Sequence, residues 1–256
     1  MYNMQNTVND FITATFPFCA PNYFPEGTMK PLTIFAGHYG SGKTNIAVNY
    51  ALRLRMHDEP VILCDLDIVN PYFRTADAAD RLRDAGVTLV ASAFANSNLE
   101  APSLPPDVSA VFDTPGVYGV IDVGGDDQGM LALGRYANRV RQTAHDLLLV
   151  ANCYRPLARA PRDALALMRE MEQTAGLPFT GLVNNPNIGA ATTENDVLAA
   201  KPYIEELSAL TGLPVVMTCI DVRLRPPNHS GATRHPSTEG NDILWLDLIE
   251  NRFGVT

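Results

Sequence analysis

The chain has 256 residues, of which 46% are hydrophobic and 18% charged, and its formal net charge is −9. This composition is that of an ordinary globular protein, and no apolar run reaches the roughly 20 residues of a membrane-spanning helix, so disordered, fibrous and membrane-spanning classes are excluded. With 28 Asp and Glu against 19 Lys and Arg, the acidic balance also argues against non-specific binding to nucleic acid or anionic lipid.

Residues 1–30 are rich in aromatic residues and proline, and no Lys or Arg precedes Lys30. This pattern favours an extended N-terminal arm over a helix or an export signal. The four cysteines are widely spaced and form no CxxC pair, which is typical of reduced cysteines packed as small apolar residues in a cytoplasmic protein. We therefore expect a cytoplasmic protein with an arm over 1–30 and one domain over 31–256.

From residue 31 onward, short apolar β-type segments alternate with helical patterns, which predicts βαβ units and a parallel sheet. In chain order, the expected strands are 32–36, 61–64, 87–91, 117–122, 146–151, 179–183 and 215–218. The expected helices are 44–56, 75–85, 129–142, 159–175, 193–211 and 242–251. This order predicts a three-layer, doubly wound α/β domain with a mostly parallel sheet. Two long polar stretches, 92–116 and 221–240, are expected to be functional or disordered loops.

A glycine-rich motif, Gly-His-Tyr-Gly-Ser-Gly-Lys-Thr at 37–44, directly follows the first expected strand and opens the first expected helix. It matches the phosphate-loop pattern GxxxxGK(S/T), in which backbone N–H groups surround a triphosphate. Lys43, one of only three lysines, is expected to bind the β- and γ-phosphates, and Thr44 to place its hydroxyl on Mg²⁺. The residues of this loop expected to bind nucleotide are Gly37, His38, Gly40, Ser41, Gly42, Lys43 and Thr44.

A magnesium nucleotide site also needs acidic residues at strand ends, to hold the metal's water shell and to orient an attacking water. Asp65 and Asp67 follow the second strand, and their spacing points both carboxylates the same way in an extended segment. Two candidates compete further on. Asp113 follows only a weak strand, whereas Asp122 ends a strong apolar run and Gly125 follows within three positions, as in a nucleotide-state sensor. We favour Asp122.

The sixth expected strand ends in Asn184, at the edge where doubly wound folds bind ligands, and its amide can read a purine base. A guanine-reading Asn-Lys-x-Asp would place Lys and Asp where this chain has Asn185 and Asn187, so ATP is favoured over GTP. Arg74 and Arg155 each follow a strand at the same edge, and either could reach a phosphate or an acidic substrate. We favour the alternative, that both are ordinary surface arginines.

These features give the chain, from about 31 to 218, a resemblance to the MinD/ParA-type P-loop NTPases of the SIMIBI class. It is most similar to a subgroup of CobQ/CobB/MinD/ParA nucleotide-binding domains. The segments that carry the resemblance are 37–44, 65–74, 122–127 and 183–187. The resemblance implies that the protein binds Mg·ATP, hydrolyses it slowly and forms a homodimer across the nucleotide.

The resemblance also implies roles for single residues. Lys43 and Thr44 take the phosphate and metal roles, Asp67 is similar to the switch I acid that positions water, Asp122 to the metal-side acid, and Asn184 to the base-reading asparagine. Lys43, Asp67 and Asp122 are thus the expected catalytic residues, and Thr44, Asp67 and Asp122 the expected metal ligands.

One departure from the class is specific. Its phosphate loop has a second lysine directly after the first glycine, where this chain has His38, and a neutral imidazole cannot supply the same fixed charge. A MinD-type nucleotide sandwich would therefore lack one of its charged contacts here, which leaves dimerisation across the nucleotide open. The absence of a CxxC pair argues against the iron–sulfur carriers of the class.

Three functions fit the sequence. The first is an ATPase switch whose nucleotide state controls a partner protein. The second is a small-molecule kinase or an ATP-dependent ligase of the dethiobiotin synthetase type, with a substrate pocket walled by 92–116 and 221–240. The third is a module that binds nucleotide without turnover. We rank the switch first because the segment after Asp122 and the resemblance agree.

Overall fold

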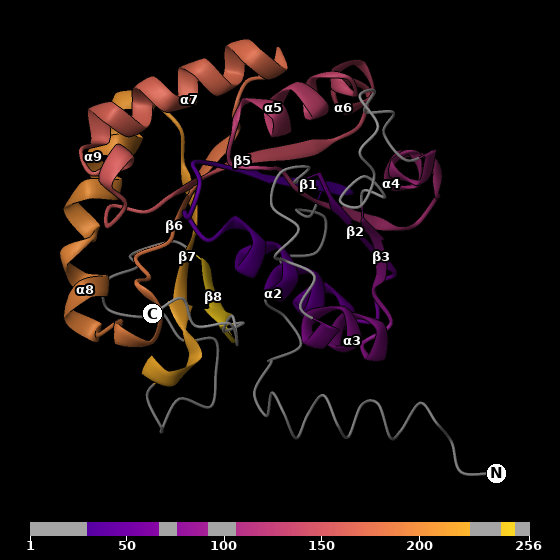
Figure 1. Cartoon of the computed structure of the whole chain (residues 1–256), viewed down its shortest axis with the longest axis horizontal. Helices are drawn as coiled ribbons and strands as arrows, with labels where there is room; N and C mark the ends of the chain where they lie inside the picture. The colour runs from indigo at the N-terminus through magenta and orange to yellow at the C-terminus, as the bar shows by residue number, and fades with distance from the viewer. Residues whose placement is uncertain (1–29, 67–75, 92–105, 226–241, 249–256) are drawn as a thin grey trace.

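The computed structural model describes residues 30–66, 76–91, 106–225 and 242–248, so the expected arm and most of both long polar stretches lie outside the described residues. Within these ranges the chain forms one parallel sheet covered by helices (Figure 1). The strands are β1 (Leu32–Ala36), β2 (Val61–Asp65), β3 (Thr88–Ala91), β4 (Tyr118–Asp122), β5 (His145–Ala151), β6 (Gly181–Asn184), β7 (Val215–Asp221) and β8 (Asp242–Leu246). The α-helices are α2 (Lys43–Arg55), α3 (Ala76–Asp84), α4 (Ala110–Asp113), α5 (Asp127–Gly134), α6 (Ala137–Gln142), α7 (Pro161–Ala175), α8 (Glu194–Ala199) and α9 (Lys201–Thr211). Short 3-10 helices lie at Pro106–Ser109, Pro156–Ala158, Gly189–Ala191 and Val222–Leu224.

The strand order is β3-β2-β4-β1-β5-β6-β7-β8, and every described strand pair is parallel. The chain therefore starts near the centre of the sheet at β1, builds one half through β2, β3 and β4, and then builds the other half through β5 to β8. This is the doubly wound α/β fold that the sequence predicts, and in such folds ligands bind beyond the carboxyl ends of the central strands.

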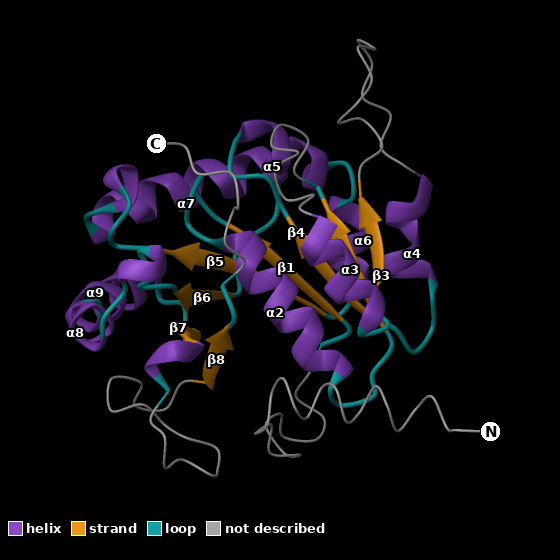
Figure 2. Cartoon of the chain, turned by 60° about the horizontal axis from the view of Figure 1, so that its bottom comes forward, coloured by secondary structure: helices purple, strands orange, loops and turns teal. Residues whose placement is uncertain are grey.

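The two faces of the sheet carry separate apolar cores, because neighbouring strand residues point to opposite faces. On one face, Phe35 packs with α2 and α3, and its ring meets that of Tyr50 edge-on with centroids 5.3 Å apart. On the other face, Ile34 belongs to the core covered by α4, α5, α6, α7 and α9. Figure 2 shows α2 and α3 on one side of the strands and α5 and α7 on the other. Helices α2 and α5, which follow the adjacent strands β1 and β4, thus lie on opposite faces, and a crevice forms where the chain changes face.

Three sequence expectations differ from the structure. The expected helix 242–251 is wrong over its described part, because residues 242–246 form β8, whose Ile243, Leu244 and Leu246 are buried. The expected helix 193–211 is two helices, since Pro202 stands in the first turn of α9 and lacks the N–H that a continuous helix requires. The expected helix 129–142 also divides, into α5 and α6, after Gly134. The other boundaries differ from the expected ones by no more than three residues.

In the part of the chain that the structure describes, no helix combines the length and the apolarity that crossing a membrane would require. The expected loop 92–116 is helical over its described end, where a 3-10 turn runs into α4.

Candidate nucleotide-binding site

The phosphate loop connects β1 to α2 at the centre of the sheet, and its shape depends on glycine. Gly42 is the N-cap of α2 with a φ of 92°, and a Cβ there would lie 2.3 Å from the Asn185 side-chain nitrogen. A Cβ on Gly37 would lie 2.6 Å from the Val150 carbonyl oxygen. The first turn of α2 holds no acidic residue, so its N-terminal partial positive charge has no neighbouring carboxylate on that turn. The loop is thus an anion-binding cradle of the phosphate-loop type.

Lys43 and Thr44 occupy the first turn of α2, as the motif predicts. Lys43 is buried, and its Nζ donates a hydrogen bond to the His38 carbonyl oxygen at 3.2 Å, so the ammonium group folds back over the loop. Thr44 is half-buried. His38 keeps its ring beside the loop through a 2.9 Å contact between Nδ1 and the Tyr39 carbonyl oxygen.

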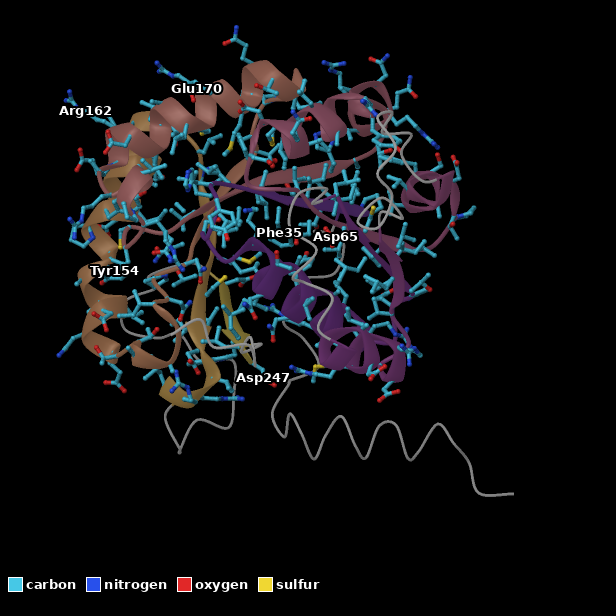
Figure 3. The ribbon with its side chains drawn as sticks, in the orientation of Figure 1. Phe35, Asp65, Tyr154, Arg162, Glu170 and Asp247 are labelled. Carbon is cyan, nitrogen blue, oxygen red and sulfur yellow. The ribbon has the colours of Figure 1, made fainter. Side chains whose placement is uncertain are left out.

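Asp122 ends β4 beside the phosphate loop. It is buried, and the backbone around it joins three strand ends: its carbonyl oxygen accepts from Leu66 N at 2.8 Å, and Val123 N donates to Phe35 O at 3.0 Å. Asp65 of β2 is in register with Asp122. Figure 3 labels Asp65 and Phe35 on the two strands that flank β4. The candidate acid of β4 therefore lies at the carboxyl edge of the strand next to β1.

Gly125 packs directly on the phosphate loop. A Cβ at this position would lie 2.6 Å from Tyr39 N, 2.7 Å from Tyr39 Cα and 2.8 Å from Lys43 Nζ. Asp126 then caps α5 by accepting a hydrogen bond from Gly129 N at 3.0 Å. The segment after Asp122 thus runs over the motif lysine and into α5.

Two acidic candidates do not enter this arrangement. Asp113, the competitor of Asp122, is exposed at the end of α4, where it forms an ion pair with Arg139, and it precedes β4 instead of ending it. Asp67, together with Arg74, lies outside the described residues. The structure therefore brings together Lys43, Asp122 and Gly125 and leaves Asp113 at the other end of β4.

Asparagines brace the loop at the ends of β5 and β6. Asn184 ends β6 and is buried, in register with Ala151 of β5. Its neighbour Asn185 donates from Nδ2 to the Ser41 carbonyl oxygen at 2.5 Å. Asn187 donates to Asn185 Oδ1 at 2.5 Å and to the Cys219 carbonyl oxygen at 3.0 Å. This bracing role of Asn185 and Asn187 was not predicted from the sequence, where both residues stood out only as departures from a guanine motif. Several asparagines directly after one buried strand were the available signal of such a network.

Asn152 extends this network from the end of β5. Its Nδ2 donates to the Asn187 carbonyl oxygen at 2.9 Å, and its Oδ1 accepts from Tyr154 N at 2.9 Å. The amides are thus largely engaged in holding backbone, which positions the phosphate loop against β5, β6 and β7.

A cavity of about 180 Å³ opens beside this network. Its lining includes Gly40, Asn45, Asn152, Arg155, Asn185 and Leu246. It adjoins the phosphate loop at Gly40 and Gly42.

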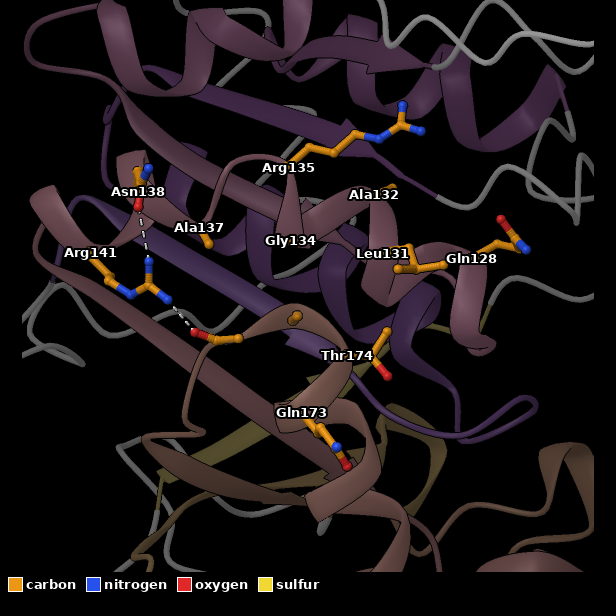
Figure 4. A pocket seen from close by; sticks show the side chains of 12 residues that line it. Gln128, Leu131, Ala132, Gly134, Arg135, Ala137, Asn138, Arg141, Gln173 and Thr174 are labelled. Atoms are coloured by element: carbon orange, nitrogen blue, oxygen red, sulfur yellow. Dashed lines mark hydrogen bonds between the residues drawn. The ribbon is translucent and has the colours of Figure 1, made fainter.

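A larger cavity, of about 590 Å³, lies between α5, α6 and the end of α7 (Figure 4). Arg141 crosses it, donating to Asn138 Oδ1 at 3.0 Å and to the Gly176 carbonyl oxygen at 2.5 Å. It contains none of the predicted site residues, and its lining includes neither the phosphate loop nor the carboxyl ends of the strands.

The residues present fit a nucleotide-bound Mg²⁺. Mg²⁺ keeps several waters and takes one or two protein ligands beside the substrate phosphates, so it needs no dedicated cage. Within the described ranges, no group of three or more His, Cys, Asp or Glu forms such a cage. The Thr44 hydroxyl and the Asp122 carboxylate are the described groups at the loop that suit this role.

The cysteines of the described residues, Cys64, Cys153 and Cys219, are free. Burial raises the pKa of the Cys64 and Cys219 thiols well above the ordinary value. Both therefore stay protonated and pack as small apolar groups.

The sequence matches no family model, and no curated protein matches it. Solved structures do match. FtsY from Mycoplasma mycoides aligns with 82% of this chain and 66% of its own length, with a TM-score of 0.51 at 18% identity. Chloroplast FtsY from Physcomitrella patens aligns with 83% of this chain and 65% of its own, with a TM-score of 0.51 at 15% identity.

The chain thus spans 65–66% of the length of these structures. At such low identity the likeness shows the fold alone, which is the α/β fold that this chain shares with these FtsY structures. It does not single out the MinD/ParA-like subgroup.

Proposed function

We propose that the protein binds Mg·ATP at the phosphate loop, hydrolyses it slowly and acts as a nucleotide switch for a partner protein. The observation that carries this proposal is the packing of Gly125 on Lys43 and Tyr39. A lysine that binds the terminal phosphates must leave its bond to the His38 carbonyl, and the segment resting on it must respond. Because that segment leads directly into α5, nucleotide state would be transmitted to the helical face of the molecule.

Mg²⁺ would be held by the nucleotide phosphates, Thr44 and Asp122, and would supply charge neutralisation at the terminal phosphates. Lys43 would bind the β- and γ-phosphates from the loop side. Asp67 is proposed to position the attacking water.

ATP is proposed over GTP because of Asn185 and Asn187. Asn185 donates to the Ser41 carbonyl, and Asn187 donates to the Cys219 carbonyl and to Asn185 Oδ1. Neither residue supplies the carboxylate that would accept from both guanine N1–H and the 2-amino group. Asn184 is the proposed base-reading residue. Tighter binding of Mg·GTP than of Mg·ATP would contradict this assignment.

The test is calorimetric titration with Mg·ATP and Mg·GTP, combined with a measurement of phosphate release. Lys43→Ala should abolish binding, whereas Lys201→Ala, which removes a surface lysine 3.8 Å from Glu205, should leave it unchanged. Slow release that a second protein accelerates supports the switch. Strong stimulation of ADP release by a metabolite would instead support the kinase or ligase, and binding without any release the module without turnover.

Sedimentation of the chain with and without Mg·ATP tests the subgroup. ATP-dependent dimerisation would support a MinD/ParA-like protein despite His38. A monomer that still hydrolyses ATP would argue for a switch that is complete within one chain.

A further inference from the structure

Arg155 lies against the phosphate loop in a position that the motif does not account for. It follows β5, and the carbon and Nε of its guanidinium lie 3.5 Å from where a Cβ on Gly40 would stand. It also lines the 180 Å³ cavity beside the loop, together with Gly42 and Asn185. The guanidinium is thus packed over the face of a glycine whose φ of 75° belongs to the phosphate cradle.

The backbone holds Arg155 firmly while its charge stays available. Arg155 N donates to the Asn152 carbonyl oxygen at 3.1 Å, and its own carbonyl accepts from Ala158 N at 3.1 Å. The residue is exposed, and no side-chain hydrogen bond or ion pair joins its guanidinium to another residue in the described part of the chain. Other arginines there, such as Arg81 and Arg223, pair with carboxylates.

This placement matters because the loop is poor in fixed positive charge. Lys43 is the only lysine in the loop. The position directly after Gly37, the first glycine of the loop, holds His38 and not a second lysine. A nucleoside triphosphate brings several negative charges, and guanidinium is the side chain best suited to bind phosphate oxygens with two parallel N–H groups.

We propose that Arg155 is a second phosphate-binding residue, contributed by the same chain, that contacts the polyphosphate of the nucleotide from the β5 side of the loop. The ligand class is a nucleoside di- or triphosphate, and the inference rests on the proposed function. It goes beyond that function because it assigns a second positive charge at the phosphates to a residue of the same chain, so that no partner subunit has to supply one.

The experiment compares Arg155→Ala, Arg155→Lys and Arg159→Ala by calorimetric titration of the full chain with Mg·ATP and Mg·ADP. Arg159 is an exposed arginine on the same connection that lines neither the loop nor the cavity, so it is the matched control. Arg155→Ala should raise the Kd roughly 10- to 100-fold, as expected for a lost charge-assisted hydrogen bond. Arg155→Lys should recover part of the affinity because it keeps the charge but loses the fork.

A weakening confined to Mg·ATP would place the contact on the γ-phosphate, and a weakening with both nucleotides would place it on the α- or β-phosphate. Both support the inference. The thermal midpoint without nucleotide should not change in Arg155→Ala, which separates a binding role from a structural one. If the wild-type chain bound nucleotide and Arg155→Ala had the same Kd as Arg159→Ala, this inference would be overturned while the proposed function would stand. A wild-type chain that bound neither nucleotide would overturn the proposed function and this inference with it.

Discussion

Gly125→Ala should separate the segment after β4 from the phosphate loop. The added Cβ would lie 2.6 Å from Tyr39 N and 2.8 Å from Lys43 Nζ, whereas ordinary carbon contacts are about 3.5 to 4.0 Å. Either the segment or the loop must therefore move by about 1 Å. Gly125 does not have a positive φ, so its backbone conformation is open to alanine. The expected effect therefore comes only from the steric contact of the added Cβ.

The expected size of this effect follows from two quantities. Overpacking a tight contact costs about 1 to 3 kcal/mol of unfolding free energy. A displacement of about 1 Å at a reacting centre can reduce turnover about 100-fold. We expect Gly125→Ala to lower ATP hydrolysis 10- to 100-fold with a smaller change in ADP affinity, because the segment is proposed to respond to the terminal phosphate.

The assay is single-turnover ATP hydrolysis together with urea unfolding. The matched control is Gly119→Ala in β4, the strand that precedes this segment, where a Cβ would meet the Leu32 side chain at 3.0 Å and Val111 Cβ at 3.1 Å in the apolar core. This variant should lose stability but keep its turnover per folded molecule. If Gly125→Ala hydrolysed ATP at the wild-type rate, the proposed coupling of this segment to the phosphates would be refuted.

Three further results are expected. Asp122→Asn should reduce Mg²⁺-dependent hydrolysis at least tenfold, whereas Asp113→Asn, at the other end of β4, should leave the rate unchanged; equal rates in phosphate-release assays would remove Asp122 from the metal site. Asn185→Ala should lower the unfolding free energy by about 1 to 3 kcal/mol, since the Ser41 carbonyl loses its donor, and a urea midpoint equal to wild type would contradict the bracing role. Burial raises the pKa of Asp242 above its ordinary 3.8, so the fold favours the protonated acid and this contribution to stability is lost as pH rises through the folded pKa. Asp242→Asn should therefore unfold at a higher temperature than wild type at pH 7, and a lower midpoint would count against this interpretation.

Much of the fold could be predicted because strands β1 to β7 are short, mostly apolar segments between helical patterns. β8 could not, because its five residues, Asp-Ile-Leu-Trp-Leu, have no periodicity that separates a buried strand from part of a helix. Pairing decides the matter, since Met217 to Asp221 of β7 stand in parallel register with Asp242 to Leu246. The division of the expected helix 193–211 was signalled locally by Pro202.

The candidate site divides in the same way. Gly37, Gly42, Lys43 and Thr44 form the cradle through local geometry, so their motif was sufficient to predict it. Asn185 braces Ser41 across 144 positions of sequence, and no local pattern encodes that contact.

The sequence by itself determined the phosphate loop, the alternation of strands and helices, and the preference for Asp122 over Asp113. Only the tertiary structure decided that Gly125 rests on Lys43, that Asn185 holds the loop, and that Arg155 lies over Gly40. The physical reason is that parallel βαβ units bring the carboxyl ends of β1, β4, β5 and β6 to one edge, whatever their distance along the chain. Which side chains meet at that edge depends on strand order and register, and both are set by packing across the whole sheet.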